Sequence, residues 1–136
     1  MPEPRTVKLA DILVNYSLKV KKGERVLINS SSEIAKPLVL EVYKKALEAG
    51  GHPFVNIAFE EMSNIFYNLA SREQLLDFPK VRLFEARNMD CIVNIRASVN
   101  KRALSNVDSK KIAERSKVLK SISEVIVNEK RWVLCN

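Results

Sequence analysis

The sequence predicts a single α/β domain over residues 1–136, with a three-layer, doubly wound, mostly parallel sheet of about four strands and helices on both faces. Short apolar runs typical of buried strands alternate with longer segments whose apolar residues recur at helical spacing. Because parallel neighbours need crossover connections, this alternation predicts right-handed strand–helix–strand units. The composition, 46% hydrophobic and 29% charged with only 3 glycines, is typical of an ordinary globular protein.

The first predicted elements are a helix and a buried strand. The helix is expected to end near Val20 and to bury one face, made of Leu9, Ile12, Leu13 and Tyr16. The strand covers residues 25–29, where three consecutive apolar residues indicate burial on both faces. A strand of this kind belongs in the middle of a sheet.

The second helix is predicted to follow the polar break of residues 30–32. Serine hydroxyls there can accept hydrogen bonds from the unpaired N–H groups of a first helical turn. Pro37 suits only that first turn, so the residues directly after Ser32 are expected to be irregular. The helix should run to Ala49, with Gly50 as a left-handed stop. Its expected buried side consists of Leu38, Val42, Ala46 and Leu47.

The rest of the chain continues the alternation. Further strands are predicted at residues 54–59, 91–95 and 132–135. A helical stretch contains Ile65, Phe66 and Leu69, and another helix starts near Ser71, whose spacing to Gln74 fits a capping box.

Two more features complete this second half. Pro79 is expected to break the helix that starts near Ser71, before residues 81–87. A last helix, capped by Asp108, has an apolar stripe of Ile112, Leu119, Ile122 and Ile126. Because the sequence stops directly after the last strand, we expect the chain to be part of a longer protein.

The net charge of +7 raises the question of a polyanionic partner. From Lys101 onward, nine basic and four acidic residues give +5 of this net charge. Within that stretch, five basic residues lie on the last predicted helix, namely Lys110, Lys111, Arg115, Lys117 and Lys120. We interpret these side chains as a solvated helix face, which disfavours nucleic acid as a partner.

No apolar run approaches the roughly 18 residues that span a bilayer, and no secretion signal is present, so we expect no membrane association and a cytoplasmic location. Cys91 and Cys135 lie in apolar runs and are expected in the core.

No residue pattern predicts a catalytic or metal site. Paired CxxC and HExxH motifs are absent, and the only histidine, His52, is expected to be structural or exposed. The pair Glu60-Glu61, without a histidine, makes a weak metal site. Residues 29–33 contain no glycine and end in an acid, which argues against a phosphate-binding turn. We therefore predict no catalytic residue and no metal ligand in this chain.

One positional regularity remains at the predicted strand ends. Asn29, Asn56 and Asn94 each lie near the carboxyl end of a strand, where ligands and partner domains dock in parallel sheets. The alternative, polar residues that simply mark strand exits, stays open. The residues proposed to face substrate or a docking domain are Ser30, Ser31, Asn56, Asn94, Arg96 and Asn100.

Three stretches resemble a known enzyme family in the same order. They are residues 8–28, which read KLADILVNYSLKVKKGERVLI, residues 37–53, which contain Pro-Leu-Val and end in Ala-Gly-Gly-His-Pro, and residues 90–108, which begin DCIVNIRA. Together these stretches resemble the opening of the thermophilic-type metallo-aminopeptidases, the aminopeptidase T and aminopeptidase S family. The resemblance covers nearly the whole chain.

The resemblance implies an exopeptidase that removes N-terminal amino acids from peptide substrates with a pair of divalent metal ions, zinc, cobalt or similar. The ligands of that family belong to a C-terminal domain beyond residue 136, so none is carried over to this chain. The fragment alone is then expected to be inactive, and a homodimer is implied because family members are often dimeric. Two alternatives are a small cytoplasmic binding module, for nucleic acid through the basic C-terminal helix, and a stand-alone protein of this fold without catalysis.

Overall fold

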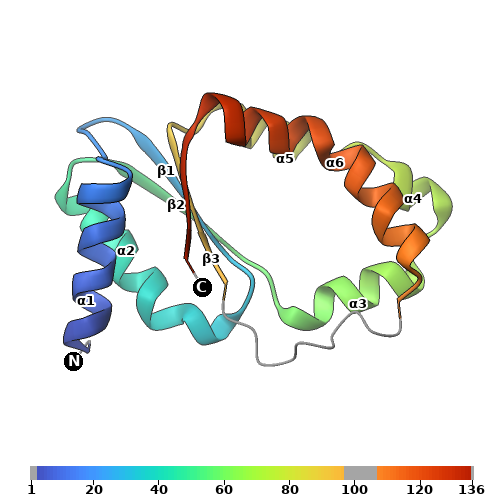
Figure 1. Cartoon of the computed structure of the whole chain (residues 1–136), viewed down its shortest axis with the longest axis horizontal. Coiled ribbons are helices and arrows are strands. Elements are labelled where there is room, and N and C mark those ends of the chain that lie inside the picture. Colours follow the sequence, from blue (N-terminus) through green and yellow to red (C-terminus); the bar gives the residue numbers. More distant parts are fainter. Residues whose placement is uncertain (1–2, 97–106, 136) are drawn as a thin grey trace.

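A computed structural model describes residues 3–96 and 107–135. The described residues form a four-stranded parallel sheet with strand order β2-β1-β3-β4. Figure 1 shows the sheet nearly edge-on between two groups of helices. The strands are β1 (Arg25–Ser30), β2 (His52–Ile57), β3 (Cys91–Ile95) and β4 (Arg131–Cys135). The predicted α/β class, with a parallel sheet and helices on both faces, is confirmed.

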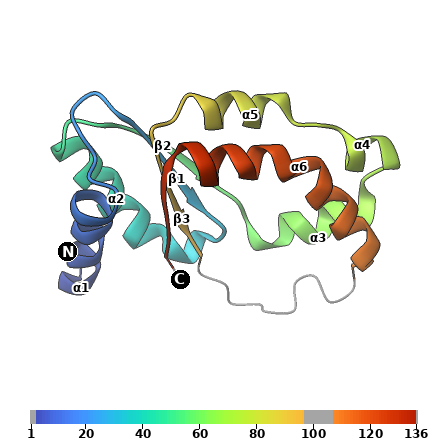
Figure 2. The ribbon, with the colours of Figure 1, turned by 45° about the horizontal axis from the view of Figure 1, so that its top comes forward.

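Helices lie on both faces of this sheet. In chain order they are α1 (Pro4–Asp11), the π-helical segment η1 (Ile12–Ser17), the 3-10 turn η2 (Glu33–Ala35), α2 (Lys36–Glu48), α3 (Glu60–Leu69), α4 (Arg72–Leu76), α5 (Lys80–Arg87) and α6 (Ser109–Glu129). Figures 1 and 2 show α1 and α2 on one face, and α5 and the end of α6 on the other. The start of α6 extends away from the sheet toward α3 and α4.

Three groups of buried side chains hold these layers together. The main core joins α1, η1 and α2 to residues of β1 and β3 such as Val26, Ile28 and Val93. On the other face, Leu27, Met89 and Ile92 pack with Ile126 of α6. The third group, Ala86, Ile122 and Val125, joins α5 to α6. The sheet therefore has one broad core on the α1–α2 side and a narrow contact on the α6 side.

The first helix differs from its predicted form. Leu13 is buried as predicted, but Leu9, Ile12 and Tyr16 are exposed, whereas Ala10, Val14 and Leu18 are buried. The buried residues Ala10, Leu13 and Val14 have the same i, i+3 and i+4 spacing as the predicted face, so spacing alone does not decide which face meets the core. A π-helical turn follows, in which the amide of Leu18 donates to the carbonyl of Leu13 at 3.0 Å, a spacing of five residues. The helix ends at Ser17, before the predicted Val20.

The second helix begins and ends as predicted. The Ser32 hydroxyl accepts a hydrogen bond from the Ile34 amide at 3.2 Å, and Pro37 lies in the first turn of α2 after the irregular turn η2. Gly50 adopts a φ of 85°, the left-handed conformation that ends the helix. The predicted burial of Leu47 is wrong, since its side chain is 53% exposed.

The later helices and strands lie close to their predicted positions. Strand β2 runs from His52 to Ile57, two residues earlier than predicted, whereas β3 has its predicted bounds. Ser71 and Gln74 form the predicted capping box at α4, and the Asp108 carboxylate caps α6 at the Lys110 amide. Pro79 directly precedes α5. Of the two cysteines, Cys91 is fully buried and Cys135 is partly buried against the main core.

Two of the five basic side chains of α6 do not lie on a solvated face, contrary to the interpretation from the sequence. The Lys111 ammonium donates to the Tyr67 carbonyl at 3.0 Å. The Arg115 guanidinium donates to the carbonyls of Leu75 and Asp77. Long basic side chains can cover a neighbouring element and pair with its last carbonyls, which a charge pattern alone does not distinguish from solvation. The other three, Lys110, Lys117 and Lys120, are exposed.

Candidate functional site

The three asparagines at the strand ends lie in one row across the sheet. Asn29 of β1 is in register with Asn56 of β2 on one side and with Asn94 of β3 on the other. Residues in register on parallel strands point to the same face, so the three carboxamides lie side by side near the carboxyl edge of the sheet. We call Asn56, Asn29 and Asn94 the asparagine row.

Hydrogen bonds connect this row to itself and to α5. The Asn29 side-chain amide donates to the side-chain oxygen of Asn94 at 3.2 Å. The Asn56 side-chain amide donates to the Glu85 carboxylate at 2.9 Å. Asn29 and Asn94 are half-buried, whereas Asn56 is exposed. The pair Asn29–Asn94 is therefore fixed within the sheet and still reachable from solvent.

The row lies just beyond the part of this face that helices cover. One step toward the amino ends of the strands, Leu27 and Ile92 are buried beneath Ile126 of α6. At the edges of the same face Phe54 is 44% and Trp132 is 45% exposed. Leu134, in register with Asn94, is 40% exposed. The asparagine row is thus a polar strip flanked by partly exposed apolar side chains.

The asparagine row crosses the point of the sheet where the winding of the chain reverses. The helix α2, between β1 and β2, packs on one face of the sheet, whereas α6, between β3 and β4, packs on the other. The boundary between β1 and β3 is therefore the point where the winding of the sheet reverses. In open parallel sheets, ligands bind at the carboxyl edge of such a switch point. The Asn29–Asn94 hydrogen bond crosses this boundary.

The other candidates from the sequence lie in different surroundings. Ser30 is buried on the opposite face of β1, where its hydroxyl donates to the Ser32 carbonyl at 2.7 Å. Ser31 is exposed, and its amide donates to the Ile95 carbonyl at 3.2 Å. Arg96 is exposed, and its amide donates to the Cys135 carbonyl at 2.8 Å. Asn100 lies outside the described residues.

The described residues do not offer a metal centre. Within residues 3–96 and 107–135, no group of three or more histidine, cysteine, aspartate or glutamate side chains could hold a metal ion. His52 is exposed at the start of β2, and Glu60 and Glu61 occupy the first turn of α3. This donor set does not fit a pair of divalent ions.

Arg131 forms a second polar cluster, which the sequence did not reveal. Its guanidinium donates to the Leu18 carbonyl at 2.9 Å, to the Cys91 sulfur at 2.9 Å and to the Glu24 carboxylate. The hydrogen bond from Arg131 lowers the pKa of Glu24 below its usual range. Burial raises the pKa of the Cys91 thiol to about 11, so this sulfur is protonated at neutral pH and is not an activated nucleophile.

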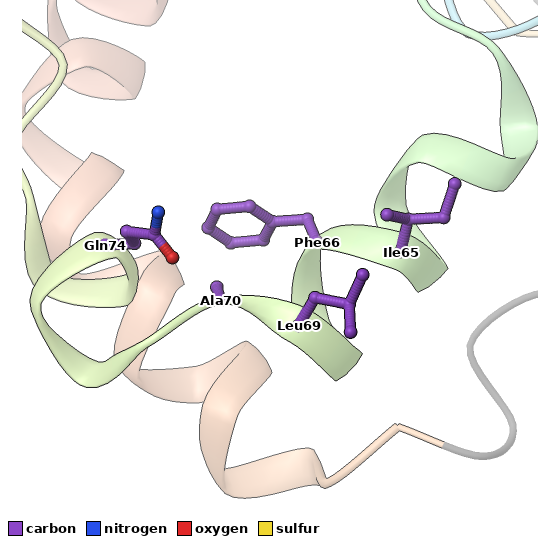
Figure 3. Close-up of a pocket in the computed structure, with 5 residues that line it drawn as sticks. All are labelled: Ile65, Phe66, Leu69, Ala70 and Gln74. Carbon is purple, nitrogen blue, oxygen red and sulfur yellow. The ribbon is translucent and has the colours of Figure 1, made fainter.

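The helices α3, α4, α5 and α6 lie together beside the sheet, and we call them the arm. A shallow apolar hollow lies on this arm. Figure 3 shows its lining, which comes from α3 and the start of α4 and consists of Ile65, Phe66, Leu69, Ala70 and Gln74. The Arg115 guanidinium lies 5.2 Å from the centre of the Phe66 ring. No side chain of the hollow is ionisable, so it offers an apolar contact surface rather than acid–base chemistry.

Among the described helices, none has the length and apolar character needed to cross a membrane.

Comparison with known proteins connects the chain to one peptidase family. The family model described as thermophilic metalloprotease (M29) matches residues 3–135. Aminopeptidase AmpS of Bacillus subtilis (strain 168) is 30% identical over 109 residues, which cover 76% of this chain and 26% of the relative. Wild-type AmpT from Thermus thermophilus superposes with a TM-score of 0.76 at 20% identity, over 96% of this chain and 35% of that chain. At this identity the AmpT match shows a common fold, and the chain spans only about a quarter of the length of AmpS.

Proposed function

Because the chain belongs to the thermophilic metalloprotease (M29) family, we propose that it is the N-terminal, non-catalytic part of a metal-dependent aminopeptidase. The whole enzyme removes N-terminal amino acids from peptides. The observation that carries the proposal is the coverage of AmpS, because the match accounts for 26% of that relative. Most of the length of such an enzyme is left for a domain with the metal ligands.

The divalent metal pair, zinc, cobalt or similar, is assigned to that C-terminal domain. The described residues of this chain lack a suitable group of ligands. Arg131 joins β4 to Leu18 and Glu24, which is a packing role. The asparagine row lies at the open carboxyl edge of the sheet, and we assign this edge to the wall of the substrate cavity.

The direct test is an assay of the 136-residue chain. Incubation with zinc or cobalt ions and aminoacyl p-nitroanilides should give no turnover above the buffer rate. Calorimetric titration with the same ions should show no tight binding. Metal-dependent turnover comparable with that of AmpS would refute the proposal.

A chimera supplies the positive test. In AmpS, the segment that matches this chain over 109 residues is replaced by the corresponding segment of this chain. If the segment is a non-catalytic wall, the chimera should retain metal-dependent aminopeptidase activity with the metal affinity of AmpS. A deletion of the segment serves as the control and should abolish activity. Loss of metal binding in a folded chimera would show that the replaced AmpS segment supplies metal ligands, which would contradict a non-catalytic role.

The alternative of a nucleic-acid-binding module loses support from the structure. Lys111 and Arg115 donate to backbone carbonyls of neighbouring helices, which leaves Lys110, Lys117 and Lys120 as exposed cations on α6. Binding through phosphate contacts would weaken steeply with salt, so a filter-binding titration at two salt concentrations tests it. A homodimer and a cytoplasmic location stay predictions from the sequence.

A further inference from the structure

We propose that the Asn29–Asn94 pair is a subsite for the main chain of an extended peptide. This inference rests on the proposed function, since it gives the substrate-cavity wall a specific ligand chemistry. It concerns two half-buried carboxamides that are joined by a hydrogen bond of 3.2 Å across the switch point of the sheet.

The first argument is the hydrogen-bonding capacity that remains unused. A carboxamide has an oxygen that accepts and a nitrogen that donates two hydrogen bonds. Asn29 uses its nitrogen and Asn94 its oxygen in their mutual bond. Within the described part of the chain, the Asn29 oxygen and the Asn94 nitrogen have no protein partner. The pair therefore presents an acceptor and a donor, which match the N–H and C=O groups of a peptide main chain.

The second argument is the surroundings of the pair. A half-buried polar group gains from a partner because it has already lost part of its hydration. Leu134 lies beside Asn94 in the same register and is 40% exposed, and Phe54 lies at the other edge of the same face. These apolar surfaces can receive side chains of a peptide whose main chain bonds to the amides. Polar groups flanked by apolar walls are typical of ligand sites.

The structure disfavours a nucleotide at the same edge. A phosphate would need unpaired N–H groups after β1, but the Ser32 hydroxyl already accepts from the Ile34 amide. The adjacent Glu33 carboxylate would repel an anion, and residues 29–33 contain no glycine to allow close approach. A neutral amide ligand avoids both conflicts.

The test is an NMR titration of the 136-residue chain with N-acetyl-trialanine amide, a peptide without charged ends. The side-chain NH2 signals of Asn29 and Asn94 should shift with peptide concentration. Asn94→Asp removes the free donor but keeps an acceptor for Asn29, and it should weaken binding about tenfold. Asn68→Asp makes the same charge change at an exposed asparagine of α3 and should leave binding unchanged.

A second probe guards against a variant that fails to fold. In this probe an ester replaces the amide between the first and the second alanine of the peptide, so one N–H donor is lost. The wild-type chain should bind it about tenfold more weakly. Absence of shifts at Asn29 and Asn94, shifts confined to the α3 hollow, or equal affinity for the ester would each overturn the inference.

The outcomes separate this inference from the proposed function. Peptide hydrolysis by the isolated chain would refute the proposed function whether or not the asparagines bind peptide. A chain that neither hydrolyses nor binds the probe would refute the subsite alone. Adenosine monophosphate is titrated in parallel, and shifts of the asparagine pair with this nucleotide but not with peptide would also overturn the inference.

Discussion

At the scale of single residues, Arg131 connects parts of the chain that are far apart in sequence. Its guanidinium donates to the Leu18 carbonyl, the Glu24 carboxylate and the Cys91 sulfur. The replacement Arg131→Met keeps the aliphatic part and removes these three hydrogen bonds, whereas the Lys21 amide still donates to the Glu24 carboxylate. We expect the free energy of unfolding to fall by about 1–2 kcal/mol, at the lower end for charged hydrogen bonds because solvent screens a partly exposed side chain. Urea denaturation measures this loss.

The matched control for that variant is Lys44→Met. Lys44 is exposed on α2 and takes part in none of the hydrogen bonds or ion pairs of the described structure. Its replacement should change the free energy of unfolding by less than about 0.5 kcal/mol. Equal losses in the two variants would contradict a specific role for Arg131.

Glu24 predicts how the stability of the chain depends on pH. The hydrogen bond from Arg131 holds the pKa of this carboxyl below its ordinary value of 4.5. The ionised form therefore stabilises the folded state at pH 7, and this contribution is lost as the pH falls through 4.5 and then through the lower folded pKa. The difference in unfolding free energy between wild type and Glu24→Gln should be largest at pH 7 and shrink toward pH 3. A difference that stays constant over this range would contradict the assignment.

The sequence indicated one of the two polar clusters, the asparagine row, but not the other, the cluster around Arg131. The asparagines could be placed because each follows an apolar run, and parallel strands bring their carboxyl ends to one edge. Their common face could not be placed, because it depends on the register between strands. Arg131 and Glu24 are 107 positions apart, and no local pattern signals such a pair. The same holds for Glu85 as the partner of Asn56.

At the scale of elements, α6 fastens the short helices of the arm. Arg115 donates to the carbonyls of Leu75 and Asp77 at the end of α4, and its guanidinium lies over the Phe66 ring of α3. Arg115→Met should therefore loosen α3 and α4 while β1 and β3 stay protected. Hydrogen exchange should accelerate several-fold at residues 60–76 only.

Lys117→Met is the control for this prediction. Lys117 is an exposed lysine of the same helix, so its replacement should leave the exchange of α3 and α4 unchanged. Faster exchange in the sheet of the Arg115 variant would show that the arm and the sheet open together. That result would contradict an independent fastening role.

The elements themselves were largely predictable, and the exceptions have local causes. Caps at Ser71, Asp108 and Gly50 act within a few residues, so the sequence identifies them directly. The predicted buried face of the first helix is wrong because two overlapping sets, Leu9-Ile12-Leu13 and Ala10-Leu13-Val14, have the same helical spacing, and spacing alone does not say which of them meets the core. Leu47 was assigned to the core from its spacing, but the end of α2 leaves it in solvent.

At the scale of the whole molecule, the sequence predicted three layers but not their unequal contact. Helical spacing shows that α6 has an apolar stripe. It does not show that one part of this stripe packs against α5 and another part against the sheet. Among the described residues, the buried apolar contact between the arm and the sheet on that face consists of Leu27, Met89 and Ile92 with Ile126. The main core is much broader and lies entirely on the other side. This asymmetry leaves the asparagine row uncovered.

The separate cores predict that the molecule opens in two steps. Ile122 is buried in the group that joins α5 to α6, and it has no place in the main core. Truncation to alanine removes buried methyl groups and should cost about 2–4 kcal/mol. In Ile122→Ala this loss should appear as faster hydrogen exchange in α5 and α6, with the slowest amides of β1 and β3 unchanged. Val42→Ala deletes methyl groups from the main core and should instead accelerate exchange in every element, because opening the sheet core also releases the arm. Uniform acceleration in both variants would show a single cooperative unit, and the arm could then not move independently of the sheet edge that carries the asparagine row.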